Sequence, residues 1–298
     1  MTLEKKATII STATAGILTI IKFIVGFMSG SVALLASAMD SIMDMFVSIF
    51  NLFAVHNSEK PADDRFNYGR GKIEALAAVI EGTIIALSGL FVLYEAIKKY
   101  FHNEQVTHLD ISIIVMLVSF VMTFGLVVFL NYVAKKTNSM VIKSDALHYK
   151  TDLLTNFAVL VSLVLTLFTD NVMIDVVVGG VIAVYIIFSA YELIKEGVLV
   201  LLDEAMEDEI VQQIEKIIQA ETKVTDYHYL KTRKAGKYRF VDVHLVFNCL
   251  MTLMEAHKIS DKVEDNIREL DGQSIWMMNI HLDPYDDSTH NDGKCLVE

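Results

Sequence analysis

Six long apolar segments, each able to cross a lipid bilayer as a helix, occupy the first two thirds of this 298-residue chain. A spanning helix needs about 20 mostly apolar residues, because the hydrocarbon core is about 30 Å thick. The fifth segment is the least apolar, since its first half holds several charged residues. The sequence therefore predicts six transmembrane helices in a membrane domain of residues 1–200. The segments cover residues 7–30, 32–55, 73–97, 111–134, 141–168 and 172–194.

Basic residues gather in the connections that share one side of this predicted membrane domain. Lys5 and Lys6 precede the first segment, and further Lys and Arg residues fill the connections at 56–72 and 135–140. Loops on the cytoplasmic side carry an excess of Lys and Arg, so both termini are expected in the cytoplasm. The formal net charge of −12 argues against nucleic-acid binding and fits a protein that handles cations.

After residue 200 the pattern changes to that of a small α+β domain in residues 201–284. Residues 207–221 and 252–270 have the apolar spacing of amphipathic helices. Residues 227–232, 238–247 and 274–282 have the character of strands. The expected order is α-β-β-α-β, a ferredoxin-like sheet with helices on one face, followed by a loose polar tail at 285–298. Cys249 and Cys295 form no CxxC motif, and we expect two ordinary thiols.

Two pairs of potential metal ligands lie inside the second and fifth predicted membrane helices. The pairs are Asp40 with Asp44 and His148 with Asp152, and the i, i+4 spacing puts each pair on one helix face. A carboxylate at the bilayer centre costs about 2.5–3.5 kcal/mol, so such groups need a compensating cation. Three carboxylates and one imidazole suit Zn²⁺, and Fe²⁺, cobalt or cadmium could use the same set. The alternative is that these groups make helix–helix hydrogen bonds or line a water-filled groove.

A second group of potential ligands lies on the predicted sheet. Alternation along the second and third strands puts His244, His281 and Asp283 on the face away from the helices. His228 on the first strand and His257 on the second helix complete a set of five. One surface histidine would indicate nothing, but several around an aspartate favour a metal site.

Motifs in both parts of the chain resemble the cation diffusion facilitator family, and most closely its bacterial zinc and ferrous-iron efflux branch. SAMDSIMDMF and DALHYKTDLLTN are similar to the family's second and fifth transmembrane helices. HYLKTR, DVHLV, EAHKISD and NIHLDP are similar to its cytoplasmic domain. The resemblance implies a homodimer in the bacterial inner (plasma) membrane that exports Zn²⁺, or also Cd²⁺ or Fe²⁺, in exchange for protons.

The same resemblance implies roles for the individual ligands. The transported metal would bind the four membrane ligands, and two zinc ions bridged by Asp283 would bind the cytoplasmic set. His228 and His244 would hold one of these ions, and His257 and His281 the other. It also implies an ion pair between Lys72 and Asp203 near the dimer's membrane–cytosol junction, although Lys72 could equally be a plain surface charge.

Two positions depart from the family pattern. Related exporters can hold a further metal in the loop after the second helix, in a pattern like DDxHxxGHG, but Phe66 and Arg70 stand at the histidine positions here. We therefore expect this loop site to be absent or weakened, with Asp63 serving mainly to cap the loop. Lys150 lies between the two ligands of the fifth helix, and we expect it to point away from them and to snorkel or pair.

Two other classes of function remain open from the residues. A metal-sensing membrane scaffold would bind zinc without transporting it, and the complete buried four-ligand set argues against it. An intramembrane metalloenzyme is the other class. The sequence contains no HExxH motif, and we predict that the protein is not an enzyme.

Overall fold

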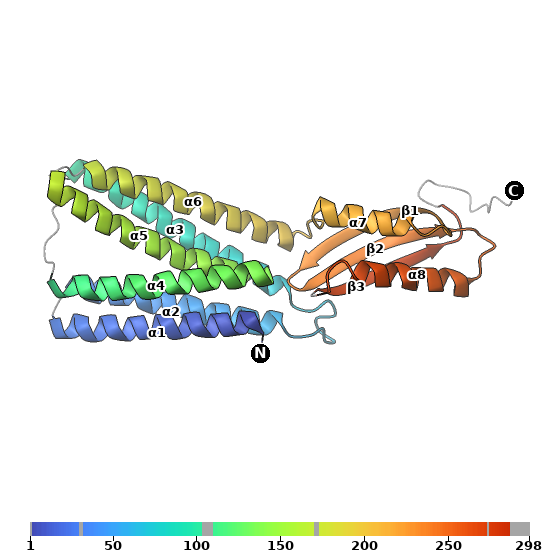
Figure 1. Cartoon of the computed structure of the whole chain (residues 1–298), viewed down its shortest axis with the longest axis horizontal. Helices are drawn as coiled ribbons and strands as arrows, with labels where there is room; N and C mark the ends of the chain where they lie inside the picture. The colour runs from blue at the N-terminus through green and yellow to red at the C-terminus, as the bar shows by residue number, and fades with distance from the viewer. Residues whose placement is uncertain (1, 30–31, 103–109, 170–172, 273, 287–298) are drawn as a thin grey trace. The chain divides into compact units, whose positions relative to one another are not determined.

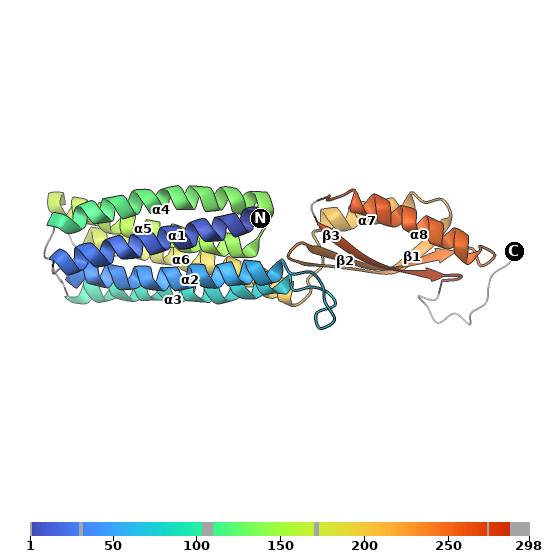
Figure 2. The same cartoon turned by 90° about the horizontal axis from the view of Figure 1, so that it is seen from below.

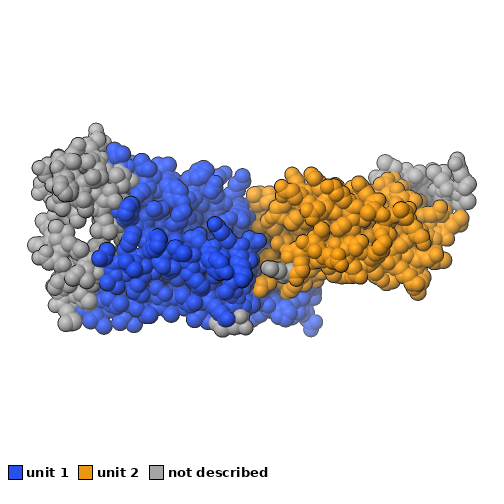
Figure 3. Space-filling view, in the orientation of Figure 1, with its two compact units in different colours: residues 1–198 blue, residues 199–298 orange. Residues whose placement is uncertain are grey.

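The structure is a computed structural model that describes residues 2–29, 32–102, 110–169, 173–272 and 274–286 (Figure 1). Some side chains within the helices, including that of Asp40, also lie outside the description. Residues 287–298, which make up most of the predicted loose tail, lie outside the described residues as well. The chain divides into two compact units, Met1–Val198 and Leu199–Glu298, coloured separately in Figure 3.

Six long helices build the first unit, in agreement with the six predicted apolar segments (Figure 1). Neither of the chain's two prolines, Pro61 and Pro284, falls within them, so no proline removes a helical hydrogen bond. Within the described residues, Leu3–Ile24, Lys72–Tyr94 and Leu117–Thr137 are long and apolar enough to cross a membrane. The helices are α1 Leu3–Ser29, α2 Val32–Ser58, α3 Lys72–His102, α4 Asp110–Thr137, α5 Met140–Thr169 and α6 Met173–Leu201.

The bundle core joins α1, α2, α3, α4 and α5 through small and branched residues. Ala7, Ala54, Leu130 and Ala146 are all buried in one cluster, and small side chains of this kind let helices approach closely. Large apolar residues such as Phe53 point outward. This distribution suits a surrounding lipid phase, which does not penalise exposed apolar surface.

Glycines allow α3 and α6 to approach closely. A β-carbon added at Gly82 would lie 2.8 Å from the Ile194 side chain. One added at Gly197 would lie 3.0 Å from the carbonyl oxygen of Ala75. A β-carbon at Gly180, also on α6, would meet nothing within 4 Å. The contact therefore depends on particular glycines and not on glycine content.

The second unit has the predicted order α-β-β-α-β. Strand β2 lies between the other two, antiparallel to β1 and parallel to β3. Helix α8 supplies the crossover that a parallel pair requires. Figure 2 shows α7 and α8 on the same face of the sheet, where Ile214, Leu245 and Val263 are fully buried. The elements are α7 Asp208–Gln219, β1 Val224–Ala235, β2 Tyr238–Phe247, α8 Leu253–Arg268 and β3 Ile275–Asp283.

The expectation of ordinary thiols is wrong for Cys249, which is disulfide-bonded. A disulfide depends on proximity in the folded chain, and no spacing motif around Cys249 reveals such proximity in the sequence. Cys295 lies outside the described residues.

Candidate metal centres

Helices α2 and α5 bring three of the four predicted membrane ligands together. His148 Nε2 lies 3.3 Å from Asp44 Oδ1 and 3.7 Å from Asp152 Oδ2. One ligand atom from each of the three residues lies within 4.8 Å of the others. Ligands about 2.0–2.1 Å from a tetrahedral zinc are roughly 3.3 Å apart, so this spacing suits such an ion. Asp40 belongs to α2 one turn before Asp44, but its side chain lies outside the described residues and its role stays a prediction.

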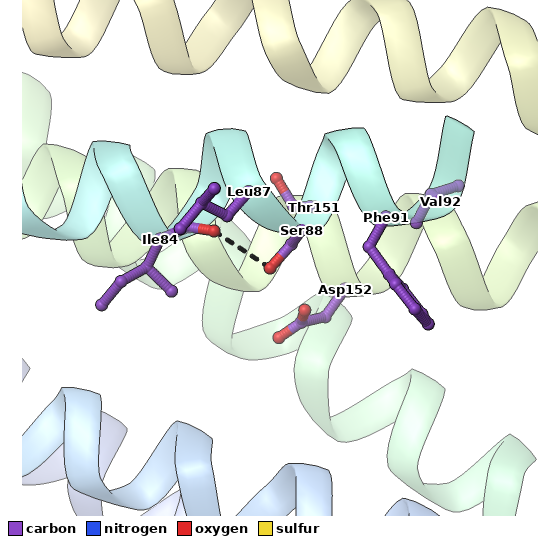
Figure 4. A pocket seen from close by; sticks show the side chains of 7 residues that line it. All are labelled: Ile84, Leu87, Ser88, Phe91, Val92, Thr151 and Asp152. Carbon is purple, nitrogen blue, oxygen red and sulfur yellow. Dashed lines mark hydrogen bonds between the residues drawn. The ribbon is translucent and has the colours of Figure 1, made fainter. Parts of the chain in front are cut away.

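The Asp152 carboxylate connects this cluster to a pocket between α3 and α5. The side chain of Asp152 is 34% exposed. It lines a pocket of about 440 Å³ with Thr151 and five residues of α3 (Figure 4). Among these, Ser88 donates its hydroxyl hydrogen bond to the Ile84 carbonyl at 3.1 Å, and the remaining walls are apolar. The pocket therefore opens onto the Asp152 side of the metal-ligand cluster.

Lys150, which was predicted to point away from the ligands and to snorkel or pair, contacts Tyr185 of α6. Its ammonium donates to the Tyr185 hydroxyl at 2.5 Å and lies 5.1 Å from the centre of the same ring. The lysine charge is thus engaged by Tyr185, and the prediction of a paired lysine is confirmed.

A further buried polar cluster next to the metal ligands was not predicted from the sequence. The Asn51 amide donates to Glu81 Oε2 at 3.0 Å and to Asp145 Oδ1 at 3.2 Å. Ser144 donates a short hydrogen bond to the same glutamate oxygen. The available signal was an acidic residue in the first half of the third apolar segment and another one turn before His148.

In the second unit, three strands each deliver one imidazole to Asp283. The strand register places His228 opposite His244, and His244 opposite His281. Asp283 Oδ2 lies 2.9 Å from His244 Nδ1 and 3.3 Å from His228 Nε2, and Oδ1 lies 3.0 Å from His281 Nε2. The carboxylate therefore faces imidazoles with both oxygens, as a residue bridging two cations would. Imidazole and carboxylate are also the donor types that zinc prefers.

His257 is not brought into this group by the structure. It lies on α8, with its Nε2 atom 3.8 Å from Asp261 and its side chain 65% exposed. Its predicted role as a ligand stays a prediction.

The structure adds two neighbours to the cluster. Asp286 Oδ1 lies 3.4 Å from His228 Nδ1. Tyr229 places its ring edge-on to His228 and His244, with centroid distances of 4.7 and 5.2 Å. The Tyr229 φ of 53° is unusual for a residue with a side chain. It accompanies a register shift in β1 between His228 and Lys231, which alternation alone does not predict.

The loop between α2 and α3 uses Asp63 for structure, as expected. Its carboxylate accepts from the backbone amides of Arg65 and Phe66 at 3.0 and 2.8 Å and pairs with Arg70. The Phe66 amide, with help from Arg65 and Arg70, holds the pKa of Asp63 below its usual range. Arg70 also lies over the Phe66 ring, 4.4 Å from its centre. These contacts engage Asp63 and Arg70 within the loop itself.

Asp203 lies just after α6 and is held within the second unit. Its carboxylate accepts a hydrogen bond from Arg233 at 3.3 Å, and its φ is 61°. Lys72 begins α3 in the first unit. The predicted Lys72–Asp203 pair stays a prediction.

Comparisons with known proteins cover both units. The model of the "Cation efflux transmembrane domain" matches residues 8–202, and that of the "Cation efflux protein, cytoplasmic domain" matches residues 206–285. Cation-efflux pump FieF of Yersinia pestis (strain Pestoides F) is 39% identical over 281 residues, covering 94% of this chain and 92% of its own. FieF of Yersinia pseudotuberculosis serotype O:3 (strain YPIII) gives the same values. A solved structure of CzrB in its zinc form is 27% identical, with a TM-score of 0.26, and covers 29% of this chain and 98% of its own.

Proposed function

This chain belongs to the cation efflux family, and we propose that it exports Zn²⁺ from the cytoplasm in exchange for protons. Family membership makes it a multi-pass membrane protein that transports cations, and a transporter rather than an enzyme. The choice of metal and the coupling to protons are the proposed parts. Cd²⁺ and Fe²⁺ are further candidate cargoes, because nitrogen and oxygen ligands do not by themselves select among these ions.

The observation that carries this proposal is the cluster of Asp44, His148 and Asp152 inside the helical bundle. Two carboxylates and an imidazole within 4.8 Å of one another supply charge and donor atoms for a divalent ion. Asp40, one turn before Asp44 on α2, would complete four ligands. Ionisable residues inside membrane helices generally mark the path of an ion or a proton.

Proton exchange follows from the chemistry of these ligands. A metal binds the carboxylates only when they are ionised and the imidazole only when it is neutral, so protons and metal compete for one site. Histidine changes its charge near neutral pH, which makes His148 the natural carrier. In this proposal the bundle exposes the cluster to each side of the membrane in turn, and protons entering from outside displace the metal there.

We also propose the arrangement in the cell and the role of the second unit. The basic loops support cytoplasmic termini in a bacterial inner membrane. The match to the family's cytoplasmic domain supports a homodimer, in which the cluster around Asp283 holds two zinc ions. Binding to one arrangement of the dimer more tightly than to another would let cytoplasmic zinc shift that equilibrium.

Metal flux into proteoliposomes tests the transport site. We expect Asp44→Ala and His148→Ala to lower zinc flux by more than about 100-fold, since even outer-shell changes weaken metal sites about 10–100-fold. Asp63→Ala, which removes a loop carboxylate, is the matched control and should retain flux. Normal flux in a well-folded Asp44→Ala dimer would overturn the assignment.

Two other outcomes separate the parts of the proposal. Zinc flux that ignores an imposed pH gradient would contradict proton exchange and leave export intact. Zinc binding without flux would favour the alternative, a metal-sensing membrane scaffold.

A further inference from the structure

Two carboxylates that are not among the metal ligands lie buried side by side in the helical bundle. Glu81 on α3 is 1% exposed and Asp145 on α5 is 0% exposed. The two are linked through Asn51 of α2, whose amide nitrogen donates to an oxygen of each, at 3.0 and 3.2 Å. They are therefore close neighbours contributed by separate helices.

The groups that hydrogen-bond these carboxylates are neutral. The described donors are the Asn51 amide and the Ser144 hydroxyl, and the Ser11 hydroxyl of α1 faces Asp145. Neutral donors reduce but do not cancel negative charge. Two buried carboxylates that share one amide would repel each other strongly if both were ionised, because little solvent screens them.

Three oxygen atoms of this cluster have unused acceptor capacity. Glu81 Oε1, Asp145 Oδ2 and the Asn51 side-chain oxygen are buried and have no hydrogen-bond partner within the described part of the chain. A buried acceptor without a donor is unfavourable. These oxygens thus lack a hydrogen-bond donor among the described residues, and a single added proton supplies one and removes one negative charge.

A proton fits this arrangement better than a metal ion. The Asn51 amide nitrogen occupies the position between the two carboxylates where a bridging cation would have to sit. Its two N–H groups point at the carboxylate oxygens and would repel a cation there. In other proteins, two carboxylates in one site avoid mutual repulsion because the pair keeps one proton.

The surroundings of the pair define what can influence its proton. The titratable group that faces both carboxylates is His148, one helical turn beyond Asp145 on α5. The Tyr149 hydroxyl, close by, is hydrogen-bonded to Ser48 at 2.7 Å. The pair lies between the metal ligands and the end of the bundle at which α3 and α5 begin.

We propose that Glu81 and Asp145 form a proton-binding site in which the pair of carboxyl groups carries one proton near neutral pH. The site is separate from the metal ligands, and it holds its proton whether or not the protein exchanges protons for metal. A failure of zinc flux would therefore leave this inference standing.

Infrared spectroscopy of the full-length, metal-free protein in lipid nanodiscs tests the site. We expect the C=O stretch of a protonated carboxyl near neutral pH, with the downshift in D₂O that an acidic proton produces. The double variant Glu81→Gln/Asp145→Asn should lose this band. Glu196→Gln is the matched control, because Glu196 is partly exposed and paired with Lys143, and it should leave the band unchanged.

Each other outcome is decisive. The proposal is overturned if the wild type shows no such band, or if the band survives in the double variant. It is also overturned if the wild type binds one zinc ion more than the double variant does, since that would identify a metal site. Should the double variant fail to fold, Glu81→Gln alone, which imitates a protonated acid in shape, is expected to keep the wild-type unfolding temperature, and a marked loss would contradict the proposal.

Discussion

At the scale of single residues, Asp283 organises the cluster in the second unit. It is 5% exposed and faces three imidazoles with its two oxygens. Asp286, three residues later, lies 3.4 Å from His228 Nδ1. Of these two aspartates, Asp283 is therefore the one that contacts imidazoles of all three strands.

Replacing Asp283 by alanine should remove most zinc binding from the second unit, because both proposed ions lose the shared carboxylate. Asp286→Ala removes one outer contact of His228, and we expect affinity to fall by only about 10-fold. Isothermal titration of the two variants with zinc measures the difference. Equal effects of the two substitutions would contradict a bridging role for Asp283.

Residue spacing predicted part of each cluster and missed the rest for physical reasons. The i, i+4 spacing on α5 and the alternation along β2 and β3 brought His148, Asp152, His244 and Asp283 to attention. Asn51 was missed because its importance depends on helices packed against α2. Tyr229 was missed because a local break in β1 places its ring, and such a break leaves no periodic signal.

At the scale of elements, the approach of α3 to α6 depends on the absence of side chains at particular positions. Gly197 meets a backbone carbonyl oxygen, which cannot move aside as the end of a flexible side chain can. In lipid, close packing of this kind is a main source of attraction between helices.

Gly197→Ala should therefore destabilise the first unit by about 1–3 kcal/mol, the usual range for an overpacked contact. Gly180→Ala on the same helix meets open space and should be neutral or stabilising by up to about 1 kcal/mol, because alanine favours helix. Thermal unfolding of the detergent-solubilised protein compares the two. Similar stability of both variants would show that the close contact of α3 with α6 at Gly197 does not determine the stability of the first unit.

Helix α8 begins at a capping box. Thr252 accepts from the Glu255 amide at 3.3 Å, and the Glu255 carboxylate receives the Thr252 amide and hydroxyl. The Thr252 hydroxyl is the main reason that the pKa of Glu255 lies below its usual value. The box is the local signal that fixes where this helix starts.

Thr252→Ala should lower the free energy of unfolding of the second unit by about 1 kcal/mol. Because the folded pKa of Glu255 is depressed, its stabilising contribution is present above the ordinary glutamate pKa and is lost as the pH falls through the folded value. Thr252→Ala should therefore raise the pKa of Glu255 toward the ordinary value. Chemical denaturation and an NMR titration of the Glu255 side chain give the two quantities, and an unchanged pKa would contradict this account.

The elements themselves were largely predictable. The six apolar segments are six helices in the structure. Helix α5 forms in spite of the charges in its first half, because those side chains contact polar partners on neighbouring helices. The predicted strand at 227–232 is shorter than β1, which extends over Val224–Ala235. Register shifts between Val224 and Asp226 and between His228 and Lys231 interrupt the alternation along β1.

At the scale of the whole molecule, the loop at Asp63 limits how much metal the protein should hold. Its carboxylate is engaged by two backbone amides and by Arg70, and Phe66 replaces a potential ligand. We expect about three zinc ions per protomer, one among the membrane ligands and two around Asp283, from the four-coordinate preference of zinc.

Metal analysis of the full-length protein after dialysis measures this number. Asp63→Ala should leave it unchanged, whereas Asp283→Ala should reduce it to about one, since the two cytoplasmic ions share that carboxylate. A tightly held additional ion that disappears in Asp63→Ala would contradict the prediction.

The imidazoles around Asp283 come from three different strands and stand directly opposite one another in the sheet. A slip of one residue at either pairing would turn one imidazole toward the helix-covered face. The full set of donors therefore exists in a single alignment of the strands. Any ion bound there would stabilise that alignment relative to every shifted one, because only the correct alignment presents the full set of donors.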